Sequence, residues 1–412
     1  MRQSTLFSKT RKQAPADEVA KNAELLIKAG FIHKEMAGVY SYLPLGLRVL
    51  NKISDVIRDE MNSIGGQELF LTVLQDKETW STTNRWSEEV VDSWFKTKLK
   101  SGTELGLGFT HEEPLTKLMK DHIQSYKDLP VYVYQIQTKF RNEPRAKSGL
   151  MRGREFLMKD FYSFSKDEKS HVEFYEKAKG AYKKIFERVG LGGRTHLTFA
   201  SGGTFSKYSH EFQTVTEAGE DTIHICSSCG TAINEEIFAE QNVCPVCNGK
   251  EFRTEKAVEV GNIFNLGSRF SEAFDLSYLD ESGQKKLVVM GSYGIGPGRL
   301  MGTIVEALSD EKGMVWPKNV APFEYHLLDL SGGNEKVKAF AEDLYGTLSA
   351  AGHEVLYDDR PARAGEKFAD ADLFGIPTRL VISEKTIGEG KIERKERTSD
   401  TPALVTKAEL VG

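Results

Sequence analysis

The chain has 412 residues, 39% of them hydrophobic and 28% charged, which is typical of a globular protein with a sizeable core and two or three domains. The net charge of −5 excludes nucleic-acid binding through overall basicity, so any contact with RNA must use local basic patches. No apolar run is long enough to span a bilayer, and the basic first sixteen residues lack the apolar core of a secretory signal. We therefore expect a cytoplasmic protein with no membrane partner.

Two helices and a strand are expected in the N-terminal part of the chain. Apolar side chains recur at helical spacing over residues 17–30 and again over residues 47–61, where a Gly-Gly pair ends the pattern. Residues 38–46 between them hold two tyrosines and a proline and are expected to be irregular. Residues 68–74 alternate enough to predict a strand.

A β hairpin is predicted in the middle of the chain. Apolar alternation at residues 131–136 and 156–164 predicts its two strands, and the polar residues 144–149 predict the loop between them. Arg152 is expected to lie on the returning arm, on the same face as Phe156.

The polar side chains of this hairpin suit a bound nucleotide. Arg141 and Arg152 offer permanently charged, bidentate contacts to phosphate. Phe156 offers a flat face to a base, and Glu143 can accept a hydrogen bond from an exocyclic amine. The alternative is a surface hairpin whose charges are only solvated, and the local pattern leaves both interpretations open.

A helix, a Gly-rich turn and a second helix are predicted farther along the chain. The first helix covers residues 169–189. The Gly-rich turn at residues 291–298 connects a short strand at 287–290 to a helix at 300–308, and such a turn lets backbone approach a ligand closely. A dinucleotide-binding loop is disfavoured because the spacing is not G-x-G-x-x-G and because Arg299 stands at the start of the helix.

From residue 325 onward the pattern changes to alternating strands and helices. The predicted strands are 325–330, 354–357 and 379–383, and the predicted helices are 334–351 and 368–374. This alternation predicts a small α/β domain with a largely parallel sheet.

All four cysteines fall in one segment, as two Cys-x-x-Cys pairs separated by fourteen residues: Cys226, Cys229, Cys244 and Cys247. Four thiolates satisfy tetrahedral zinc and leave no open position for catalysis, so this spacing predicts a structural zinc site. Redox chemistry and cysteines without a shared role are the alternatives. No cysteine remains for disulfides elsewhere, which fits a reducing compartment.

Several motifs together resemble one enzyme family. Phe-Arg-x-Glu at residues 140–143, followed by a loop and by Arg-x-x-x-Phe-x-x-x-Asp at 152–160, resembles motif 2 of class II aminoacyl-tRNA synthetases. The longer string at 149–164 is similar to the prolyl-tRNA synthetases in particular, and the Gly-rich turn with Arg299 resembles motif 3. The resemblance covers nearly the whole chain, in order.

The resemblance implies an α+β protein. It places the antiparallel-sheet catalytic domain of class II synthetases at residues 1–321, a zinc-ribbon-like module at 222–252, and an α/β anticodon-binding domain at 322–412. The interval between motifs 2 and 3 is too short for the large editing insertion of many bacterial prolyl enzymes, so none is expected. The family dimerises through motif 1, which implies a homodimer, although Thr72 stands where the family has a proline.

The resemblance also implies a reaction in which L-proline is activated with ATP and Mg²⁺ and then transferred to tRNA(Pro), with no DNA partner. The residues implied for ATP are Arg141, Glu143, Arg152, Phe156 and Arg299, of which Arg141 and Arg299 are catalytic. Those implied for proline are Thr110, Glu112, Arg141 and His210. Those implied for tRNA are Arg145, Lys147, Arg360 and Lys395.

Two of these assignments have ordinary alternatives in the residues themselves. The Glu112 carboxylate and the Thr110 hydroxyl can together accept both N–H donors of the proline imino group, yet the same element before Pro114 is also typical of a helix cap. A lone histidine such as His210 is usually a core or surface residue, and Lys395 belongs to a basic run that is typical of a solvated tail.

The residues disfavour three other classes of protein. A threonyl enzyme needs zinc with histidine ligands in its active site, whereas four cysteines here close the metal site; a glycyl enzyme belongs to the same class of alternatives. A non-catalytic RNA-binding paralogue is expected to lose a catalytic arginine, but Arg141, Arg152 and Arg299 are all present. Class I chemistry is disfavoured because neither His-Ile-Gly-His nor Lys-Met-Ser-Lys-Ser occurs.

Overall fold

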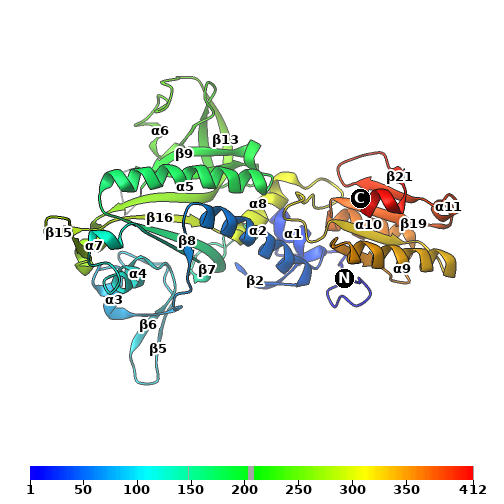
Figure 1. Ribbon diagram of the computed structural model, residues 1–412, viewed down its shortest axis with the longest axis horizontal. Coiled ribbons are helices and arrows are strands. Elements are labelled where there is room, and N and C mark those ends of the chain that lie inside the picture. The colour runs from blue at the N-terminus through cyan, green and yellow to red at the C-terminus, as the bar shows by residue number, and fades with distance from the viewer. Residues whose placement is uncertain (147, 203–207, 412) are drawn as a thin grey trace. The chain divides into compact units, whose positions relative to one another are not determined.

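The computed structural model describes residues 1–146, 148–202 and 208–411, and the chain divides into two compact units (Figure 1). The larger unit comprises Met36–Val39 and Ile53–Thr303. The smaller unit comprises Met1–Glu35, Tyr40–Lys52 and Ile304–Gly412. Among the described residues, no helix combines the length and the apolar character that crossing a membrane requires.

The larger unit is built on a sheet that has nine strands among the described residues and is called here the large sheet. In order across it, the strands are β10 (Tyr208–Val215), β9 (Thr195–Ser201), β12 (Ala232–Asn234), β11 (Asp221–Cys226), β13 (Phe252–Gly267), β16 (Val289–Ile295), β8 (Glu155–Ser165), β7 (Val131–Phe140) and β3 (Gln67–Glu68). Strand β10 also pairs with β13. Among the described strands of this sheet, the pairs are antiparallel apart from β9–β12 and β3–β7. The antiparallel pair of β7 and β8 confirms the predicted hairpin.

Helix α5 (Glu168–Arg188) covers one face of the large sheet (Figure 1). Its buried residues recur at helical spacing, and the Asp167 side chain caps its N-terminus by accepting from the Ser170 amide. The ring of Phe174 stacks on Phe161 of β8 at 5.4 Å and meets Tyr293 of β16 edge-on at 5.6 Å. These aromatic contacts fasten the helix to the two central strands.

The other face of the large sheet carries polar side chains beside an apolar cluster that includes Phe164 and Met290, because successive side chains of a strand point to opposite faces. On β8, Phe161 points to α5, so its neighbours Asp160 and Tyr162 point the other way. The Tyr162 hydroxyl donates to the Asp160 carboxylate at 3.1 Å, and Ser292 of β16 stands opposite Tyr162 in the register. The chain therefore gathers polar groups on one face, which we call the polar face.

Short elements surround the large sheet. They are α3 (Lys77–Ser81), α4 (Glu112–Met119), α6 (Glu235–Phe238), α7 (Arg269–Phe274), the strands β4 (Leu74–Asp76), β6 (Glu104–Leu107) and β5 (Lys96–Lys98), and the pair β14 (Ser277–Leu279) and β15 (Lys285–Leu287). Helices α2 (Pro44–Ser63) and α8 (Pro297–Leu308) and the strands β1 (Ile32–Met36) and β2 (Val39–Tyr42) either span both units or adjoin their boundaries.

The smaller unit contains the predicted α/β pattern. Its described strands follow the order β18 (Val355–Asp358), β17 (Tyr325–Asp329), β19 (Thr378–Ile382), β20 (Ile392–Glu396) and β21 (Ala403–Val405). Strands β18, β17 and β19 are parallel to one another. Strand β20 is antiparallel to β19, and β21 is antiparallel to β20. Its helices include α1 (Lys21–Lys28), α9 (Glu335–Ala350), α10 (Ala364–Phe374), α11 (Glu384–Gly388) and α12 (Lys407–Val411). The predicted strand–helix alternation and largely parallel sheet are confirmed.

The two strand faces of the smaller unit pack on different helices. Leu327 of β17 belongs to a cluster with Leu344 of α9, whereas the next residue, Leu328, packs with Ala371 of α10. A parallel sheet covered on both faces requires apolar side chains at consecutive strand positions, which the run from 327 to 328 supplies.

Three predicted elements need correction. Residues 38–46, expected to be irregular, contain β2 and the start of α2. The strand expected at 68–74 is limited to β3 and β4 at its two ends, so that residues 69–73 carry no assigned strand. Arg152 precedes β8, which begins at Glu155, because the loop after β7 is longer than the alternation suggests.

We expect Phe174→Ala to lower the free energy of unfolding by about 3–5 kcal/mol, because it removes the aromatic contact between α5 and the large sheet and leaves a cavity. Urea denaturation followed by circular dichroism measures this loss. The matched control is Val172→Ala on the exposed side of the same helix, expected to change the value by less than about 0.5 kcal/mol. Equal effects of the two substitutions would show that α5 is not held through Phe174.

Candidate active site

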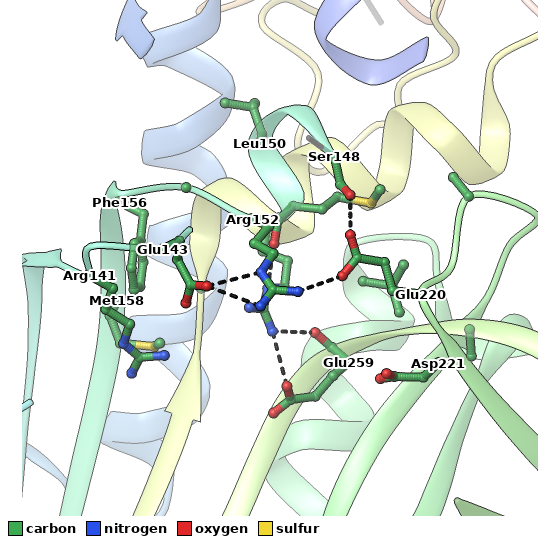
Figure 2. A pocket seen from close by; sticks show the side chains of 17 residues that line it. Arg141, Glu143, Ser148, Leu150, Arg152, Phe156, Met158, Glu220, Asp221 and Glu259 are labelled. Carbon is green, nitrogen blue, oxygen red and sulfur yellow. Dashed lines mark hydrogen bonds and ion pairs between the residues drawn. The ribbon is translucent and has the colours of Figure 1, made fainter. Parts of the chain in front are cut away.

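A pocket of about 250 Å³ opens on the polar face of the larger unit (Figure 2). It is bounded by the loop between β7 and β8, by β8 and β13, and by the start of α8. It brings together all five residues that the resemblance implies for ATP: Arg141, Glu143, Arg152, Phe156 and Arg299. They come from positions up to 158 residues apart in the chain, so strand pairing alone makes them neighbours.

Arg141 differs from the other arginines at this pocket in forming no ion pair with a described carboxylate. Its Nε atom is buried and has no hydrogen-bond partner in the described part of the chain. Its guanidinium lies instead over the rings of Phe109 and Phe156, at 4.8 and 5.3 Å from their centroids. Burial, and then the nearby charge of Arg299, lower the pKa of Arg141. A buried guanidinium held only by ring faces favours an anionic ligand.

The other two arginines are occupied by carboxylates of the chain. Arg152 donates to Glu143 at 3.0 Å and to Glu220 at 2.8 Å, as Figure 2 shows. Arg299 donates to the backbone oxygen of Glu259 at 2.8 Å and to its carboxylate at 3.2 Å. Arg152 is 43% exposed, so an entering anion can exchange for these carboxylates without breaking a buried ion pair.

A β-bulge places Glu259 at the pocket. The pairing of β10 with β13 runs from Phe212 opposite Gly261 to Gln213 opposite Glu259, so that Val260 has no partner of its own. The extra residue turns Glu259 to the same face as Asn262, whose amide donates to it at 2.8 Å. Without the bulge, Glu259 would point to the opposite face of the sheet.

Three carboxylates cluster beside Arg299. Gln213 donates to both Glu211, at 2.9 Å, and Asp221, at 2.8 Å. Burial, and then the charge of Glu259, raise the pKa of Glu211 to about 8, and burial likewise raises the pKa of Asp221. Carboxylates are the donor type that Mg²⁺ prefers, but among the described residues only the four cysteines bring their ligand atoms close enough together to share one metal ion.

Thr110 and Glu112 lie together at the start of α4. The Thr110 hydroxyl donates to Oε2 of Glu112 at 2.7 Å, and the Ser292 hydroxyl approaches Oε1 at 3.3 Å. Glu112 is 4% exposed and faces the polar side of β8 and β16. The helix-cap alternative does not hold, because the cap residue is His111 and its side chain makes no capping bond.

His111 is locked in one orientation beneath this site. Its Nε2 lies 3.0 Å from the Thr72 carbonyl and its Nδ1 lies 2.9 Å from the Lys139 amine. Burial, and then the charge of Lys139, lower the pKa of His111 to about 4. The ring is therefore neutral, donating from Nε2 and accepting at Nδ1.

His210 is not brought to Thr110 and Glu112. On β10, Glu211 points to the polar face, so its neighbour His210 points to α5, where its Nδ1 lies 2.8 Å from the Tyr175 hydroxyl. Burial lowers the pKa of His210 to about 4. The signal was present in the sequence, because His210 shares its face with Phe212, which is buried against α5.

The residues implied for tRNA are dispersed. Arg145 is exposed in the loop after β7, and Lys147 lies outside the described residues. In the smaller unit, Arg360 is held by Asp358 at 2.7 Å and Asp370 at 2.8 Å, and Lys395 is a half-buried residue of β20. The charge of Arg360 is therefore already paired with two carboxylates of the same unit.

The motif pattern did not identify the acidic side of the pocket. Glu220 pairs with Arg152 across 68 residues, and Glu259 reaches Arg299 only through the bulge. The one available signal was composition: Glu-Asp at 220–221 and Glu at 259 flank apolar strands between the two arginine motifs.

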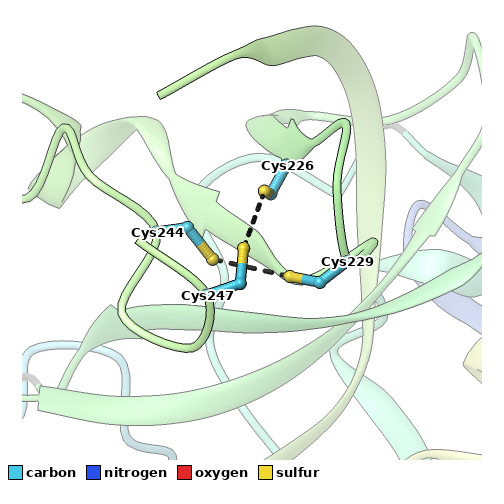
Figure 3. Close-up of side chains that lie close together, drawn as sticks. All are labelled: Cys226, Cys229, Cys244 and Cys247. Atoms are coloured by element: carbon cyan, nitrogen blue, oxygen red, sulfur yellow. Dashed lines mark hydrogen bonds between the residues drawn. The ribbon is translucent and has the colours of Figure 1, made fainter. Parts of the chain in front are cut away.

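The four cysteines converge (Figure 3). Their sulfur atoms all lie within 4.8 Å of one another, with Cys226 and Cys247 at 3.6 Å and Cys229 and Cys244 at 3.5 Å. The fourth residue after each first cysteine, Gly230 or Asn248, adopts a left-handed backbone conformation, so both pairs form the same tight turn. Gly249 comes so close that a Cβ there would lie 3.0 Å from Cys226 sulfur. Four thiols at this spacing fit a tetrahedral zinc ion.

Known proteins match the chain over its whole length. The family model described as "tRNA synthetase class II core domain (G, H, P, S and T)" matches residues 95–308, and the family model described as "Anticodon binding domain" matches residues 320–412. Proline–tRNA ligases of Geobacillus kaustophilus and Bacillus velezensis are 33% and 34% identical, over 100% of this chain and 98% and 99% of their own lengths. The chain belongs to the proline–tRNA ligase family. This result confirms the class II fold expected from the motifs and excludes the threonyl and glycyl alternatives.

Solved structures of prolyl-tRNA synthetases agree in fold. The Giardia lamblia enzyme, in complex with prolyl-adenylate, matches with a TM-score of 0.79 at 18% identity, over 94% of this chain and 75% of that one. The Cryptosporidium parvum enzyme, complexed with halofuginone and AMPPNP, matches with a TM-score of 0.78 at 18% identity, over 95% and 75%. At this identity the likeness shows the fold alone.

We expect the neutral His111 to make stability depend on acid pH. Because the folded pKa of about 4 lies below the usual value of about 6.5, its contribution is complete above pH 6.5 and is lost as pH falls toward 4. Between pH 7 and 4.5, His111→Gln should therefore lose about 2–3 kcal/mol less unfolding free energy than the wild type in urea denaturation. The exposed His122→Gln is the control, and an unchanged pH dependence in His111→Gln would contradict a buried neutral ring.

Proposed function

We propose that this chain ligates L-proline to the 3′ end of tRNA(Pro) at the polar face of the larger unit. The proposal rests on membership of the proline–tRNA ligase family and on one observation above all, the Arg141 guanidinium, which forms no ion pair with a described carboxylate. This guanidinium lies over Phe156, which lines the ATP pocket, and over Phe109, which precedes Thr110 in the chain, and a carboxylate and an α-phosphate have to meet there.

In the first step, an oxygen of the proline carboxylate attacks the α-phosphorus of ATP. The bond from that phosphorus to the bridging oxygen breaks, giving prolyl-adenylate and pyrophosphate. Arg141 bridges the carboxylate and the α-phosphate, while Arg152 and Arg299 hold the γ-phosphate. The chain's contribution is to position the reactants and neutralise charge, because no side chain is consumed.

Adenine lies between Phe156 and Arg299, and Glu143 accepts from its exocyclic amine. Support comes from the position of these three side chains around one pocket. ATP binding then requires Arg152 to exchange Glu143 and Glu220 for phosphate oxygens, which frees Glu143 to meet the base.

Mg²⁺ would bind among the phosphates of ATP, where it would supply charge neutralisation beside Arg152 and Arg299.

Proline is recognised by its secondary amine. The Glu112 carboxylate and Thr110 hydroxyl accept its two N–H donors, and Arg141 takes its carboxylate. His210 has no part in this pocket, because it lies on the opposite face of the large sheet.

In the second step, a hydroxyl of the terminal ribose of tRNA attacks the prolyl carbonyl carbon, and AMP leaves. We place the acceptor end at the loop that carries Arg145 and Lys147, and the anticodon at residues 322–412, where Lys395 contacts phosphate and Arg360 braces the domain through its ion pairs. The catalytic domain then centres on the larger unit, although the expected span 1–321 also includes segments that belong to the smaller unit.

The chain works as a homodimer in the cytoplasm. Phe70 and Leu74, at 77% and 54% exposed, follow the edge strand β3, and a second copy would cover this apolar edge. Thr72 does not prevent an extended segment here, since its carbonyl is fixed by His111.

Zinc binds the four-cysteine cluster as a structural ion in the module at 222–252, with four thiolates and no open position. Thiolates kept for one metal, with no cysteine left for disulfides, support a reducing compartment.

We further propose that the chain lacks the large editing insertion. The alignments with its relatives extend over 560–561 positions, well beyond the 412 residues of this chain, and the module at 222–252 occupies the interval between motifs 2 and 3.

ATP–pyrophosphate exchange with each standard amino acid tests the function, and proline alone should support it. Arg141→Gln should lower kcat/KM for this exchange by at least about 100-fold, because it removes the charge that bridges the two reactants, without lowering the melting temperature. Arg253→Gln on the exposed part of β13 is the control. Exchange driven by another amino acid, or an active Arg141→Gln, would refute the assignment.

Purified protein should contain one zinc per chain by mass spectrometry of the metal. Cys244→Ser should lose most of that zinc and unfold the module locally, seen as faster amide hydrogen exchange at 222–252, because three thiolates hold the ion less tightly. Ser228→Ala, in the first turn, should keep both. A wild-type protein that contains no zinc, yet exchanges its amide hydrogens slowly at residues 222–252, would contradict the zinc assignment.

A further inference from the structure

Arg85 is a buried arginine that the proposed reaction does not yet use. It is 6% exposed and follows Asn84, whose left-handed backbone (φ 59°) turns the chain so that the Arg85 amide donates to the Trp80 carbonyl at 3.1 Å. Asparagine is one of the few residues that tolerate this conformation. The turn directs a long cationic side chain under the start of α4.

There the guanidinium meets two adjacent carboxylates. Nη1 donates to both oxygens of Glu113, at 2.9 and 3.1 Å, and approaches Oε2 of Glu112 at 3.4 Å. The rings of Trp80 and Phe270 flank it at 4.9 and 5.8 Å. Burial alone would lower the pKa of Arg85, but the charges of Glu113 and Glu112 raise it, so the cation is kept.

The two carboxylates have different surroundings. Glu113 is fully buried and accepts from Thr83 at 2.8 Å and from Arg85 on both of its oxygens. Glu112 receives Arg85 and Thr110 on Oε2, whereas its Oε1 has only the long contact with Ser292 among the described residues. The donors on Oε2 therefore set the rotation of the carboxyl group and leave Oε1 free to accept a ligand hydrogen bond.

We propose that Arg85 is a positioning residue for recognition of the substrate's imino group: anchored by Glu113, it fixes the rotation of the Glu112 carboxyl group and aims Oε1 at the amine. This inference rests on the proposed role of Glu112. It makes the chain's selectivity for a secondary ammonium depend on a residue 27 positions earlier that touches no substrate atom.

The test is the split between KM and kcat in ATP–pyrophosphate exchange. Arg85→Met should raise the KM for proline by about 30-fold or more, because a buried charge pair loses one partner, while the KM for ATP changes less than about twofold. Arg85→Lys should recover part of the proline affinity, since it restores the charge without the forked geometry. A structural role would lower kcat through the active fraction and leave the proline KM unchanged.

Two further variants keep the test decisive if Arg85→Met folds poorly. Arg85→Met with Glu113→Gln removes the anchor's charge together with the arginine, so that one fewer buried carboxylate is left unpaired, and it should fold yet keep the raised proline KM. Arg85→Met added to Glu112→Gln should raise the proline KM no more than Glu112→Gln does alone. Arg188→Gln is the control, since Arg188 pairs with Asp59 and Glu60 instead.

The inference is overturned if Arg85→Met leaves the proline KM within about threefold of wild type, or if its effect multiplies with that of Glu112→Gln. Failure of the proposed function has a different signature: wild-type protein without proline-dependent exchange, or Glu112→Gln with an unchanged proline KM.

Discussion

The alternation of side chains along the large sheet is the constraint on which this active site depends. Phe161 of β8 and Tyr293 of β16 pack on α5, so the next residue on each strand is Tyr162 or Ser292, and both of these are confined to the other face. Tyr293 and Phe161 stand together on the helix side, and Ser292 and Tyr162 stand together on the polar side. The core that fixes the fold thus also fixes the orientation of the catalytic face.

The charged side chains on that face have limited exposure to solvent, and most of the arginines there are paired with carboxylates. Arg152 pairs with Glu143 and Glu220, and Arg299 pairs with Glu259, so that these carboxylates act as internal counter-ions until a ligand exchanges with them. Arg141 has no such partner among the described residues and lies against ring faces. A site built in this way is attractive to a polyanion and still avoids a cluster of unneutralised arginines.

The same reasoning connects the amino-acid site with its support. Glu112 is the first residue of α4, and both Arg85 and Thr110 contact its Oε2 atom. His111, between the two substrate-facing residues in sequence, points away and joins the Thr72 carbonyl to Lys139. Thr110 and Glu112 therefore face the proposed substrate, whereas His111 between them supports the structure of the site.

Much of this protein follows from local pattern. The spacing of apolar residues predicted α5, the strand–helix alternation of the smaller unit, and the hairpin of β7 and β8, because periodicities of 3.6 and 2 residues reflect which side chains must be buried. The motif residues Arg141, Glu143, Arg152, Phe156 and Arg299 do share one pocket, as their types suggested.

Tertiary structure alone decided the rest. The bulge at Val260 turns Glu259 into the pocket, and the strand faces of β10 separate Glu211 from His210. Arg85 reaches Glu112 only through a turn and a helix start that no periodicity connects. Register shifts and contacts between distant segments depend on how whole strands pair and pack, and a local sequence pattern carries no record of that pairing.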